Sequence, residues 1–228
     1  MEFGYWGFKG LGEIPRMTAA YLKLETTEYN PASREEWAQK KPTLGADFPN
    51  LPYLKDGDFV VSESSAIPVY LALKAKREDL LGKDIKEQTQ VRQVEGVLTD
   101  VKTQLLKGLF GEGDKKPEFE KLFSEGGVIH TKLTLLSKFL GTKDYLIGHI
   151  TLVDFFLVWV VENVQALAFS FGIPSPLASL KNLTEHFKRI NHLPELKEFV
   201  QKRRAVPQIP NSFLNFDFKT TADLPADN

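Results

Sequence analysis

The side chains able to take part in chemistry are unusually restricted in this chain. Its 228 residues include no cysteine, which excludes a thiolate nucleophile, a disulfide and a cysteine-ligated zinc. The 4 histidines, His130, His149, His186 and His192, show no metal-ligand spacing, and neither HExxH nor GxSxG occurs. We therefore expect the histidines to be structural. Tyrosine, lysine and carboxylates are left as acids or bases. Tyr5 lies in the predicted first strand, ahead of a predicted helix start, and taken alone it favours a core or interface position.

A second group of candidates surrounds a pair of prolines. Residues 47–54 hold Pro49 and Pro52 close to a predicted strand start, and Asp56-Gly57 follows as a hairpin signal. The run 62–67 then indicates a strand end that passes into a helix. This places Ser64 and its amide at a helix start, where a carboxylate group could bind.

The elements that must position these residues form a β-α-β-α-β-β-α unit. We predict a strand over 2–8, a helix from Pro15 to about Leu24, a strand over 25–29, a helix capped by Ser33, the hairpin, and a helix from Ser65 to about Lys76. A proline, a hairpin and a serine-capped helix in this order are typical of a thioredoxin-like domain that presents its backbone to a small peptide.

A dinucleotide-binding turn is the alternative for the first strand and helix. Gly10-Leu11-Gly12 follows a strand and opens a helix, as such a turn would. However, Pro15 replaces the third glycine, and the carboxylate of Glu13 would repel a pyrophosphate at the helix start. A tight strand-to-helix turn is sufficient to explain the pattern.

The rest of the chain predicts helices only. A polar linker over 78–86 leads into expected helices over 87–110, 118–140 with a weak point at Gly126-Gly127, 152–171, 177–190 and 193–204. Thr151 and Asp154 form a capping box before the most apolar helix, which we interpret as a buried helix and not a membrane span. The proline- and aromatic-rich end, 206–228, is expected to wrap the surface.

Composition sets limits on partners and location. Apolar residues make up 42% and charged residues 26% of the chain, and the net charge is −1, so nothing favours nucleic acid or an anionic membrane. No signal pattern precedes the first predicted strand, so a cytoplasmic location is expected, with organellar association left open.

Gly4-Tyr5-Trp6 and the segments 4–11, 44–67 and 148–155 resemble glutathione transferases, most closely the mu class. The resemblance covers most of the chain. It implies an α/β thioredoxin-like N-terminal domain (1–77), a linker (78–86) and an all-α C-terminal helical domain with a tail (87–228).

The resemblance also implies an activity and a site. The protein would conjugate the thiolate of glutathione, a co-substrate, to hydrophobic electrophiles, with no permanently bound cofactor and no metal. In the mu class the tyrosine matching Tyr5 donates its hydroxyl hydrogen to the sulfur. The matching glutathione-binding residues are Trp6, Leu11, Arg34, Trp37, Lys41, Asn50, Leu51, Pro52 in the cis form, Glu63, Ser64 and Asp100.

Three further roles follow from the same resemblance. Phe8 and Phe110, near Leu11, would line the pocket for the electrophile. Phe48 matches a key residue that inserts into a partner subunit, so a homodimer is expected. Asp100 matches an aspartate that reaches the glutathione of that partner.

Departures from the mu pattern leave alternatives open. The segment between Trp6 and Trp37 is shorter than in the mu class, so the loop over the active site is missing. Phe110 replaces a second tyrosine, and Pro15 and the polar tail 220–228 are unusual. The alternative is a binding or structural subunit with little or no turnover, since fold does not decide function. An isomerase that uses the same thiolate is a third hypothesis.

Overall fold

The structure, a computed structural model, describes residues 1–210, 214 and 218. The chain divides into two compact units, Met1–Glu78 (unit 1) and Asp79–Asn228 (unit 2). Unit 1 combines a small mixed sheet with helices, and unit 2 is helical over its described residues. The predicted fold class, an α/β thioredoxin-like domain followed by a helical domain, is confirmed.

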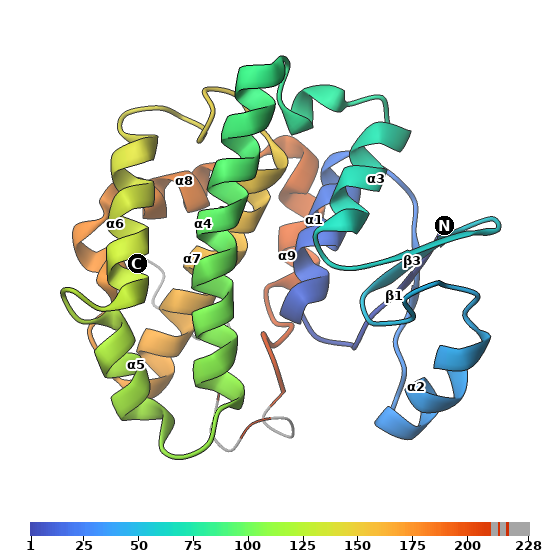
Figure 1. The fold of residues 1–228 in the computed structure, drawn as a ribbon, viewed down its shortest axis with the longest axis horizontal. Helices are drawn as coiled ribbons and strands as arrows, with labels where there is room; N and C mark the ends of the chain where they lie inside the picture. The colour runs from blue at the N-terminus through green and yellow to red at the C-terminus, as the bar shows by residue number, and fades with distance from the viewer. Residues whose placement is uncertain (211–213, 215–217, 219–228) are drawn as a thin grey trace. The chain divides into compact units, whose positions relative to one another are not determined.

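Unit 1 has the predicted order of strands and helices. Its elements are β1 (Glu2–Gly4), η1 (Gly10–Gly12), α1 (Glu13–Tyr21), β2 (Thr27–Tyr29), α2 (Arg34–Lys40), η2 (Lys41–Thr43), β3 (Tyr53–Asp56), β4 (Phe59–Ser62) and α3 (Ala66–Lys74). In Figure 1, α1 and α3 lie together on one side of the sheet and α2 lies on the other.

The sheet has the strand order β2-β1-β3-β4. β1 pairs in parallel with β2 and antiparallel with β3, and β3 pairs antiparallel with β4. Gly4, the last residue of β1, is paired with Tyr53, the first residue of β3, which is in turn paired with Ser62 at the end of β4. The segments that follow β1 and β4 and the segment that precedes β3 therefore meet at one end of the sheet.

Burial of apolar side chains explains how unit 1 holds this arrangement. Ile14 and Met17 on α1, Ile67 and Leu71 on α3, and Leu54 on β3 are all buried. Burying such side chains contributes about 1.5–3 kcal/mol each, so the helices fix the sheet firmly.

Several boundaries in unit 1 differ from the sequence prediction. The predicted first helix ends at Tyr21 and not near Leu24, and Lys23 has φ 53°, a left-handed backbone that cannot continue a helix. The hairpin loop is Gly57-Asp58 and not Asp56-Gly57, because Asp56 pairs with Phe59. Gly57 has φ 60°, which a glycine adopts without steric cost.

Unit 2 consists of helices of different lengths. They are η3 (Glu78–Leu81), which begins at the last residue of unit 1, α4 (Ile85–Phe110), α5 (Lys115–Phe123), α6 (Val128–Leu140), α7 (Leu152–Phe171), η4 (Pro176–Ser179), α8 (Lys181–Asn191), η5 (Pro194–Leu196) and α9 (Lys197–Arg203). α7 packs against α4 and α8, and α4 and α6 run side by side (Figure 1). The helical periodicity predicted for α4 is confirmed, since its apolar positions are buried: Val91, Val94, Leu98, Val101 and Leu105.

The expected single helix over 118–140 is wrong. It is two helices, α5 and α6, separated at Gly126-Gly127. Gly126 has φ 81°, and a Cβ on Gly127 would lie 2.3 Å from the carbonyl oxygen of Lys121. The helix is interrupted here, because Gly126 has a left-handed backbone and Gly127 has no room for a side chain.

The capping box predicted for the apolar helix α7 is confirmed. The amide of Thr151 donates to Asp154 Oδ2 at 2.7 Å, and the Thr151 side chain accepts from the Asp154 amide. α7 is long and apolar enough to cross a membrane, but 83% of its most apolar window is buried inside the protein. This burial is how a core helix is packed.

The remaining predictions on unit 2 are resolved in part. The predicted helices 177–190 and 193–204 each begin as a short 3-10 turn, η4 and η5, before α8 and α9. Most of the predicted surface tail, 206–228, and all of 220–228 lie outside the described residues.

Candidate active site

The end of the sheet where β1, β3 and β4 meet holds most of the predicted site residues of unit 1. Tyr5 follows β1, Leu51-Pro52 precedes β3, and Glu63-Ser64 follows β4. The register described above brings these three segments together, although they are up to about 60 positions apart in the sequence. These three segments therefore form one candidate site.

Tyr5 is held by its backbone and by its hydroxyl group. Its amide donates to the carbonyl of Tyr29 at 3.1 Å, which extends the β1–β2 pairing by one residue. Its side chain is only 6% exposed, and its hydroxyl oxygen accepts a hydrogen bond from the amide of Leu11 at 2.9 Å. Among the described residues, no protein group accepts the hydroxyl hydrogen, which is thus available to a bound molecule.

The environment of Tyr5 keeps the phenol protonated. Burial raises the pKa of Tyr5 above its usual value, and the Leu11 amide and the positive charge of Arg16 oppose that rise in part. At neutral pH the group is a hydrogen-bond donor and not a phenolate. Its chemistry is therefore that of a donor to an anion.

Two glycines shape the space around the Tyr5 ring. A Cβ on Gly10 would lie 2.6 Å from the Tyr5 hydroxyl oxygen, and a Cβ on Gly12 would lie 2.5 Å from Tyr5 Cδ1. Gly10 also has φ 41°, whereas Gly12 has an ordinary helical backbone. Gly12 is therefore required for space alone, and it lets the ring lie flush against the start of α1.

Arg16 on α1 connects Glu28 at the β2 end of the sheet to the loop that follows β1. Its guanidinium donates to both carboxylate oxygens of Glu28, at 2.9 and 2.8 Å, and to the carbonyls of Phe8 at 3.0 Å and Trp6 at 3.2 Å. It also lies 5.6 Å from the centre of the Tyr5 ring. A bidentate, buried arginine holds the loop after β1 in one conformation and places positive charge next to the phenol.

The proline turn and the turn after β4 complete the site in unit 1. The Leu51-Pro52 peptide bond is cis. The Ser62 hydroxyl donates to the carbonyl of Phe48 at 2.5 Å and so ties the two turns together. Glu63 has φ 79°, and its carbonyl accepts from the amides of residues 66 and 67. Ser64 is buried and Glu63 is exposed.

The helix after Ser64 is not capped as predicted. α3 begins at Ala66, its N-cap is Ser65, and no serine side chain makes the capping hydrogen bond. The carbonyl of Glu63 instead accepts hydrogen bonds from the first two amides of the helix, so the Ser64 side chain does not act as a cap.

Helix α2 presents the predicted Trp37. The Trp37 ring is stacked on Tyr53 with a centroid distance of 6.1 Å and an interplanar angle of 16°. As predicted, Ser33 caps the helix by accepting from the amide of Glu36 at 3.2 Å. Arg34, at the first position of α2, and Lys41, at the start of η2, are exposed cations on this segment.

The other predicted residues of unit 1 differ in exposure. Phe8 is buried and makes an edge contact with the Tyr5 ring, and Trp6 and Leu11 are half-buried. Asn50 is exposed. Phe48 is 79% exposed, which is unusual for a large apolar side chain.

Two predicted site residues belong to unit 2. Asp100 on α4 forms an ion pair with Lys132 on α6, with 2.7 Å between Nζ and Oδ2. Phe110, the last residue of α4, is 57% exposed. Asp100 therefore already has a cationic partner within its own chain.

Sequence reasoning missed Arg16, the space-making role of Gly12, and Tyr53 beneath Trp37. A signal existed for Arg16, because it is a charged residue among Ile14, Met17 and Ala19 on a helix face that has to be buried. No signal existed for Gly12, since its role depends on which way the Tyr5 ring turns. Among the described residues, no group of three or more metal-ligating side chains is present.

Comparisons with known proteins agree with this architecture. A family model described as glutathione S-transferase, N-terminal domain matches residues 1–73, and one described as glutathione S-transferase, C-terminal domain matches residues 99–203. Glutathione S-transferase Mu 2 of Homo sapiens is 32% identical over 217 residues, which cover 91% of this chain and 94% of that protein. A class-mu 26 kDa isozyme of Fasciola hepatica is 32% identical over 211 residues, 90% of each chain.

Solved structures of glutathione S-transferases and related proteins have the same fold as this chain. The glutathione S-transferase Blo t 8 superposes with a TM-score of 0.82 at 26% identity, over 95% of this chain and 99% of that one. Rat hPGDS in complex with a quinoline has a TM-score of 0.76 at 25% identity, over 91% and 98%. The resemblance seen in the sequence is confirmed, and the chain belongs to the glutathione S-transferase family.

Proposed function

We propose that the protein conjugates glutathione to hydrophobic electrophiles and that Tyr5 activates the thiol. The observation that supports this most directly is the Tyr5 hydroxyl group, buried and protonated, with its oxygen bound to the Leu11 amide. Its hydrogen is then free to be donated to a thiolate that lies beside the proline turn. Glutathione S-transferase activity is the general function of the family, and the role of Tyr5 is the specific proposal.

The energy required is within reach of one hydrogen bond. A free thiol has a pKa of about 8.5, so only a small fraction is thiolate at neutral pH. Lowering that pKa by about two units requires roughly 2.7 kcal/mol in favour of the anion. A hydrogen bond to a charged group contributes about 1.5–3 kcal/mol. Arg16, whose positive charge lies beside the ring, favours the anion further.

The rest of the tripeptide would be bound by the residues gathered at the sheet end. The backbone of Leu51, before the cis proline, would pair with the cysteinyl backbone as an added strand does. Ser64 would bind the γ-glutamyl carboxylate and Glu63 its ammonium group. Arg34, Trp37 and Lys41 would lie near the glycyl carboxylate, and further contacts are proposed for Trp6, Leu11 and Asn50. Asp100, on α4, would reach the glutathione of a partner subunit.

The remaining assignments are proposals of the same kind. Phe8 and Phe110 would line the electrophile pocket, and Phe48 would bind a second copy of the chain. The proposed domains are 1–77 for glutathione and 87–228 for the helical domain, joined by 78–86. A cytoplasmic location is proposed as well.

The decisive experiment is the Tyr5→Phe variant, which removes one oxygen atom and keeps the ring. We expect the conjugation rate with a chloronitrobenzene substrate to fall about tenfold or more, because about 2 kcal/mol of thiolate stabilisation is lost. The ultraviolet absorbance of bound thiolate, followed against pH, should report a higher thiol pKa in the variant. Glutathione affinity, measured by calorimetry, should change little.

The matched control is Tyr29→Phe, since Tyr29 donates its hydroxyl hydrogen to Glu36 at 2.9 Å and has no proposed role with sulfur. An unchanged rate and thiol pKa in Tyr5→Phe would refute the role of Tyr5. The alternative function, a binding or structural subunit, predicts instead that the unmodified protein shows little or no turnover. Failure of the unmodified protein to bind glutathione in calorimetry would favour this alternative.

A further inference from the structure

Tyr53, the first residue of β3, is a buried aromatic residue to which the proposed function gives no role. Its side chain is fully buried, and its ring is stacked on that of Trp37 on α2, with 6.1 Å between the ring centroids and 16° between the ring planes. The ring of Tyr29, the last residue of β2, lies 6.4 Å away. Trp37, which is proposed to lie near the glycyl carboxylate, thus rests on the sheet through a second ring.

Gly4 provides the space in which the Tyr53 ring lies on the sheet. Gly4 and Tyr53 are paired across β1 and β3. A Cβ on Gly4 would lie 2.0 Å from Tyr53 Cε1 and 2.3 Å from Tyr53 Cζ, far closer than two carbon atoms can approach. The ring therefore covers the backbone of Gly4 and forms a layer between β1 and the indole of Trp37.

The two ends of the Tyr53 side chain are also fixed. The hydroxyl group donates to Glu2 Oε1 at 2.6 Å, and Glu2 is the first residue of β1. The backbone of Tyr53 is held by the pairing of β3 with β1 and with β4. A ring held in this way is a rigid support, which loses little entropy when a molecule binds nearby.

Helix α2 depends on such support for its position. It has seven residues, too few to form a stable helix alone, and none of them is buried. The stack of Trp37 on Tyr53 and the hydrogen bond from Tyr29 to Glu36 Oε1, at 2.9 Å, join the helix to the sheet. The stack acts directly on the Trp37 side chain, so Tyr53 sets the plane of the indole.

The plane of the indole decides what Trp37 can bind. Its polar group is the ring N–H, a donor that points outward in the plane of the ring. A hydrogen bond weakens steeply when donor and acceptor are misaligned, and a well-aligned bond to a carboxylate is among the stronger ones. An indole whose plane is set before the peptide arrives therefore binds a carboxylate more tightly than a mobile one.

We infer that Tyr53 is a positioning residue for the glycyl end of glutathione, because it holds the Trp37 indole in the plane from which the ring N–H reaches the glycyl carboxylate. The inference rests on the proposed function, of which the peptide-binding role of Trp37 is a part. Tyr53 itself would not touch the peptide. It would set how strongly the protein prefers glutathione to the same thiol peptide without its glycine.

The proposed chemistry at sulfur depends on the opposite face of the sheet. The Tyr5 ring lies against Gly12 and Arg16 on the side of α1, whereas the Tyr53 ring faces α2 on the other side (Figure 1). A change at Tyr53 should therefore alter binding of the glycyl end and leave the activation of the thiol as it was.

The test compares glutathione with γ-glutamylcysteine, which has the same thiol and lacks the glycyl residue. In calorimetry we expect the unmodified protein to bind glutathione about tenfold or more tightly. In Tyr53→Leu, which removes the stacked ring, this preference should fall about fivefold or more through weaker glutathione binding, while the γ-glutamylcysteine affinity changes less than about twofold. The kcat at saturating glutathione and the pKa of the bound thiol should stay as in the unmodified protein.

A conservative variant separates positioning from stability. Tyr53→Phe keeps the ring and loses only the bond to Glu2, so it should be less stable and still prefer glutathione as strongly as the unmodified protein does. Tyr53→Ile, whose β-branched side chain suits a strand, repeats the test where Tyr53→Leu does not fold. Both peptides are titrated into each variant, so an unfolded fraction affects the two titrations alike.

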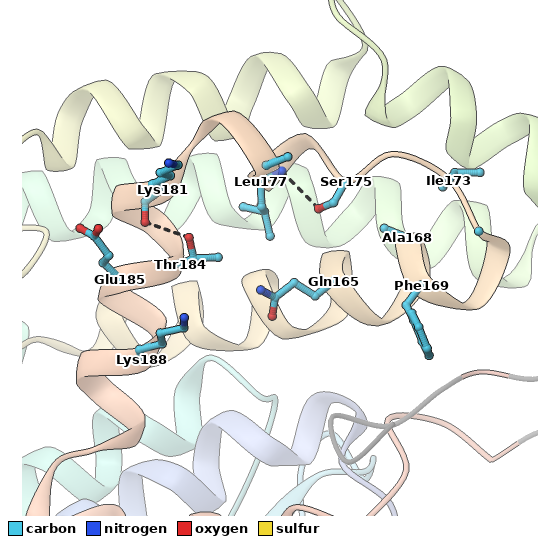
Figure 2. A pocket seen from close by; sticks show the side chains of 12 residues that line it. Gln165, Ala168, Phe169, Ile173, Ser175, Leu177, Lys181, Thr184, Glu185 and Lys188 are labelled. Atoms are coloured by element: carbon cyan, nitrogen blue, oxygen red, sulfur yellow. Dashed lines mark hydrogen bonds between the residues drawn. The ribbon is translucent and has the colours of Figure 1, made fainter. Parts of the chain in front are cut away.

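Phe169→Leu is the control in unit 2. It makes the same kind of change, from a ring to leucine, at an exposed residue that lines a cavity formed by α7, η4 and α8, as Figure 2 shows. The residues that line this cavity all belong to unit 2. The variant should therefore bind both peptides as the unmodified protein does.

Two results would overturn the inference. One is that Tyr53→Leu or Tyr53→Ile keeps the full preference for glutathione. The other is that Tyr53→Phe loses the preference as Tyr53→Leu does, which would show that stability matters and the stacked ring does not. Both results leave the role of Tyr5 intact. An unmodified protein that binds neither peptide would instead overturn the proposed function together with this inference.

Discussion

At the scale of single residues, the site depends on how tightly the Tyr5 ring is enclosed. The phenol is fixed by the Leu11 amide on its oxygen, by the Phe8 ring at its edge, and by Arg16 near its face. A hydrogen bond that stabilises an anion has to be aimed in advance, because a mobile donor would lose entropy on binding. The enclosure of the ring is therefore part of the proposed chemistry.

Replacing Gly12 by alanine tests this enclosure. The added methyl group would lie 2.5 Å from Tyr5 Cδ1, so the ring has to move. We expect the conjugation rate to fall about tenfold or more while glutathione affinity changes less, since Gly12 itself does not contact the peptide in our proposal. Gly7→Ala is the control, because a Cβ on Gly7 has no atom within 4 Å. Equal rates for the two variants would show that ring position is unimportant.

The raised pKa of Tyr5 makes a prediction about pH. Because burial raises the pKa above the usual value of 10.0, the phenol stays a donor throughout the neutral and mildly alkaline range. We expect kcat/KM for the electrophile, measured with glutathione saturating, to rise with pH through a single ionisation, that of the bound thiol, and to show no decline below about pH 9.5. A bell-shaped profile with a descending limb near pH 8 would contradict the assignment.

At the scale of secondary structure, the sheet of unit 1 is sensitive to alkali. The Tyr53 hydroxyl is buried and donates to Glu2 at 2.6 Å, and burial first, then this carboxylate, raises the pKa of Tyr53. The folded protein therefore holds that proton more tightly than the unfolded chain. This contribution to stability is fully present below about pH 10, the unfolded pKa, and is lost as the pH rises above it.

The Tyr53→Phe variant measures this contribution. At neutral pH we expect it to be less stable by about 1–3 kcal/mol, because the hydrogen bond to a carboxylate is lost. Between about pH 10 and 11, its free energy of unfolding should fall less steeply than that of the unmodified protein. Denaturant titrations at several pH values provide both quantities, and parallel pH dependences would show that Tyr53 does not contribute.

In unit 2, the start of α7 is also stabilised by hydrogen bonds to a buried carboxylate. The buried Asp154 carboxylate accepts from the amides of Thr151 and Leu146, from the Thr151 hydroxyl, and from His186 Nε2 at 2.8 Å. A capping residue thus also holds the preceding loop and a helix about 30 residues later. Removing it leaves several buried donors without a partner.

We expect Asp154→Ala to destabilise the protein by about 3 kcal/mol or more, whereas Thr151→Ala should cost about 1–2 kcal/mol, as the loss of a cap does. The midpoint of chemical unfolding checks both values. The conjugation activity of folded Asp154→Ala should remain near normal, because no proposed site residue contacts Asp154. Equal destabilisation by both changes would show that the wider network around the carboxylate adds little.

At the scale of the whole molecule, Phe48 bears on the proposed homodimer. Phe48 is 79% exposed beside the proline turn, and burial of such a ring in a partner would contribute about 1.5–3 kcal/mol in each direction of a symmetric dimer. We therefore expect Phe48→Ser to dissociate the proposed homodimer at micromolar concentration, as measured by analytical ultracentrifugation.

Ile85→Ser is the control for this change, since Ile85 is 80% exposed and has no proposed partner. It should leave the mass of the assembly unchanged. A monomeric unmodified protein would contradict the proposed homodimer and would leave Phe48 without a role.

The amino-acid sequence by itself determined the order of the elements, the periodicity of α4, the capping box at Thr151 and Asp154, and the family to which the chain belongs. These features depend on neighbouring residues, on hydrophobic periodicity and on short motifs, each of which lies within one segment of the sequence. The sequence predicts one helix where the structure has α5 and α6, because a Gly-Gly pair weakens a helix without deciding whether the helix ends there.

Only the tertiary structure decided which residues surround Tyr5, that Arg16 joins Glu28 to the loop after β1, that Asp100 pairs with Lys132, and that a pocket opens between α7 and α8. Each of these depends on the direction of a side chain across elements that are distant in sequence. Register and helix packing set that direction, and they follow from the burial of the whole apolar core and not from any one segment.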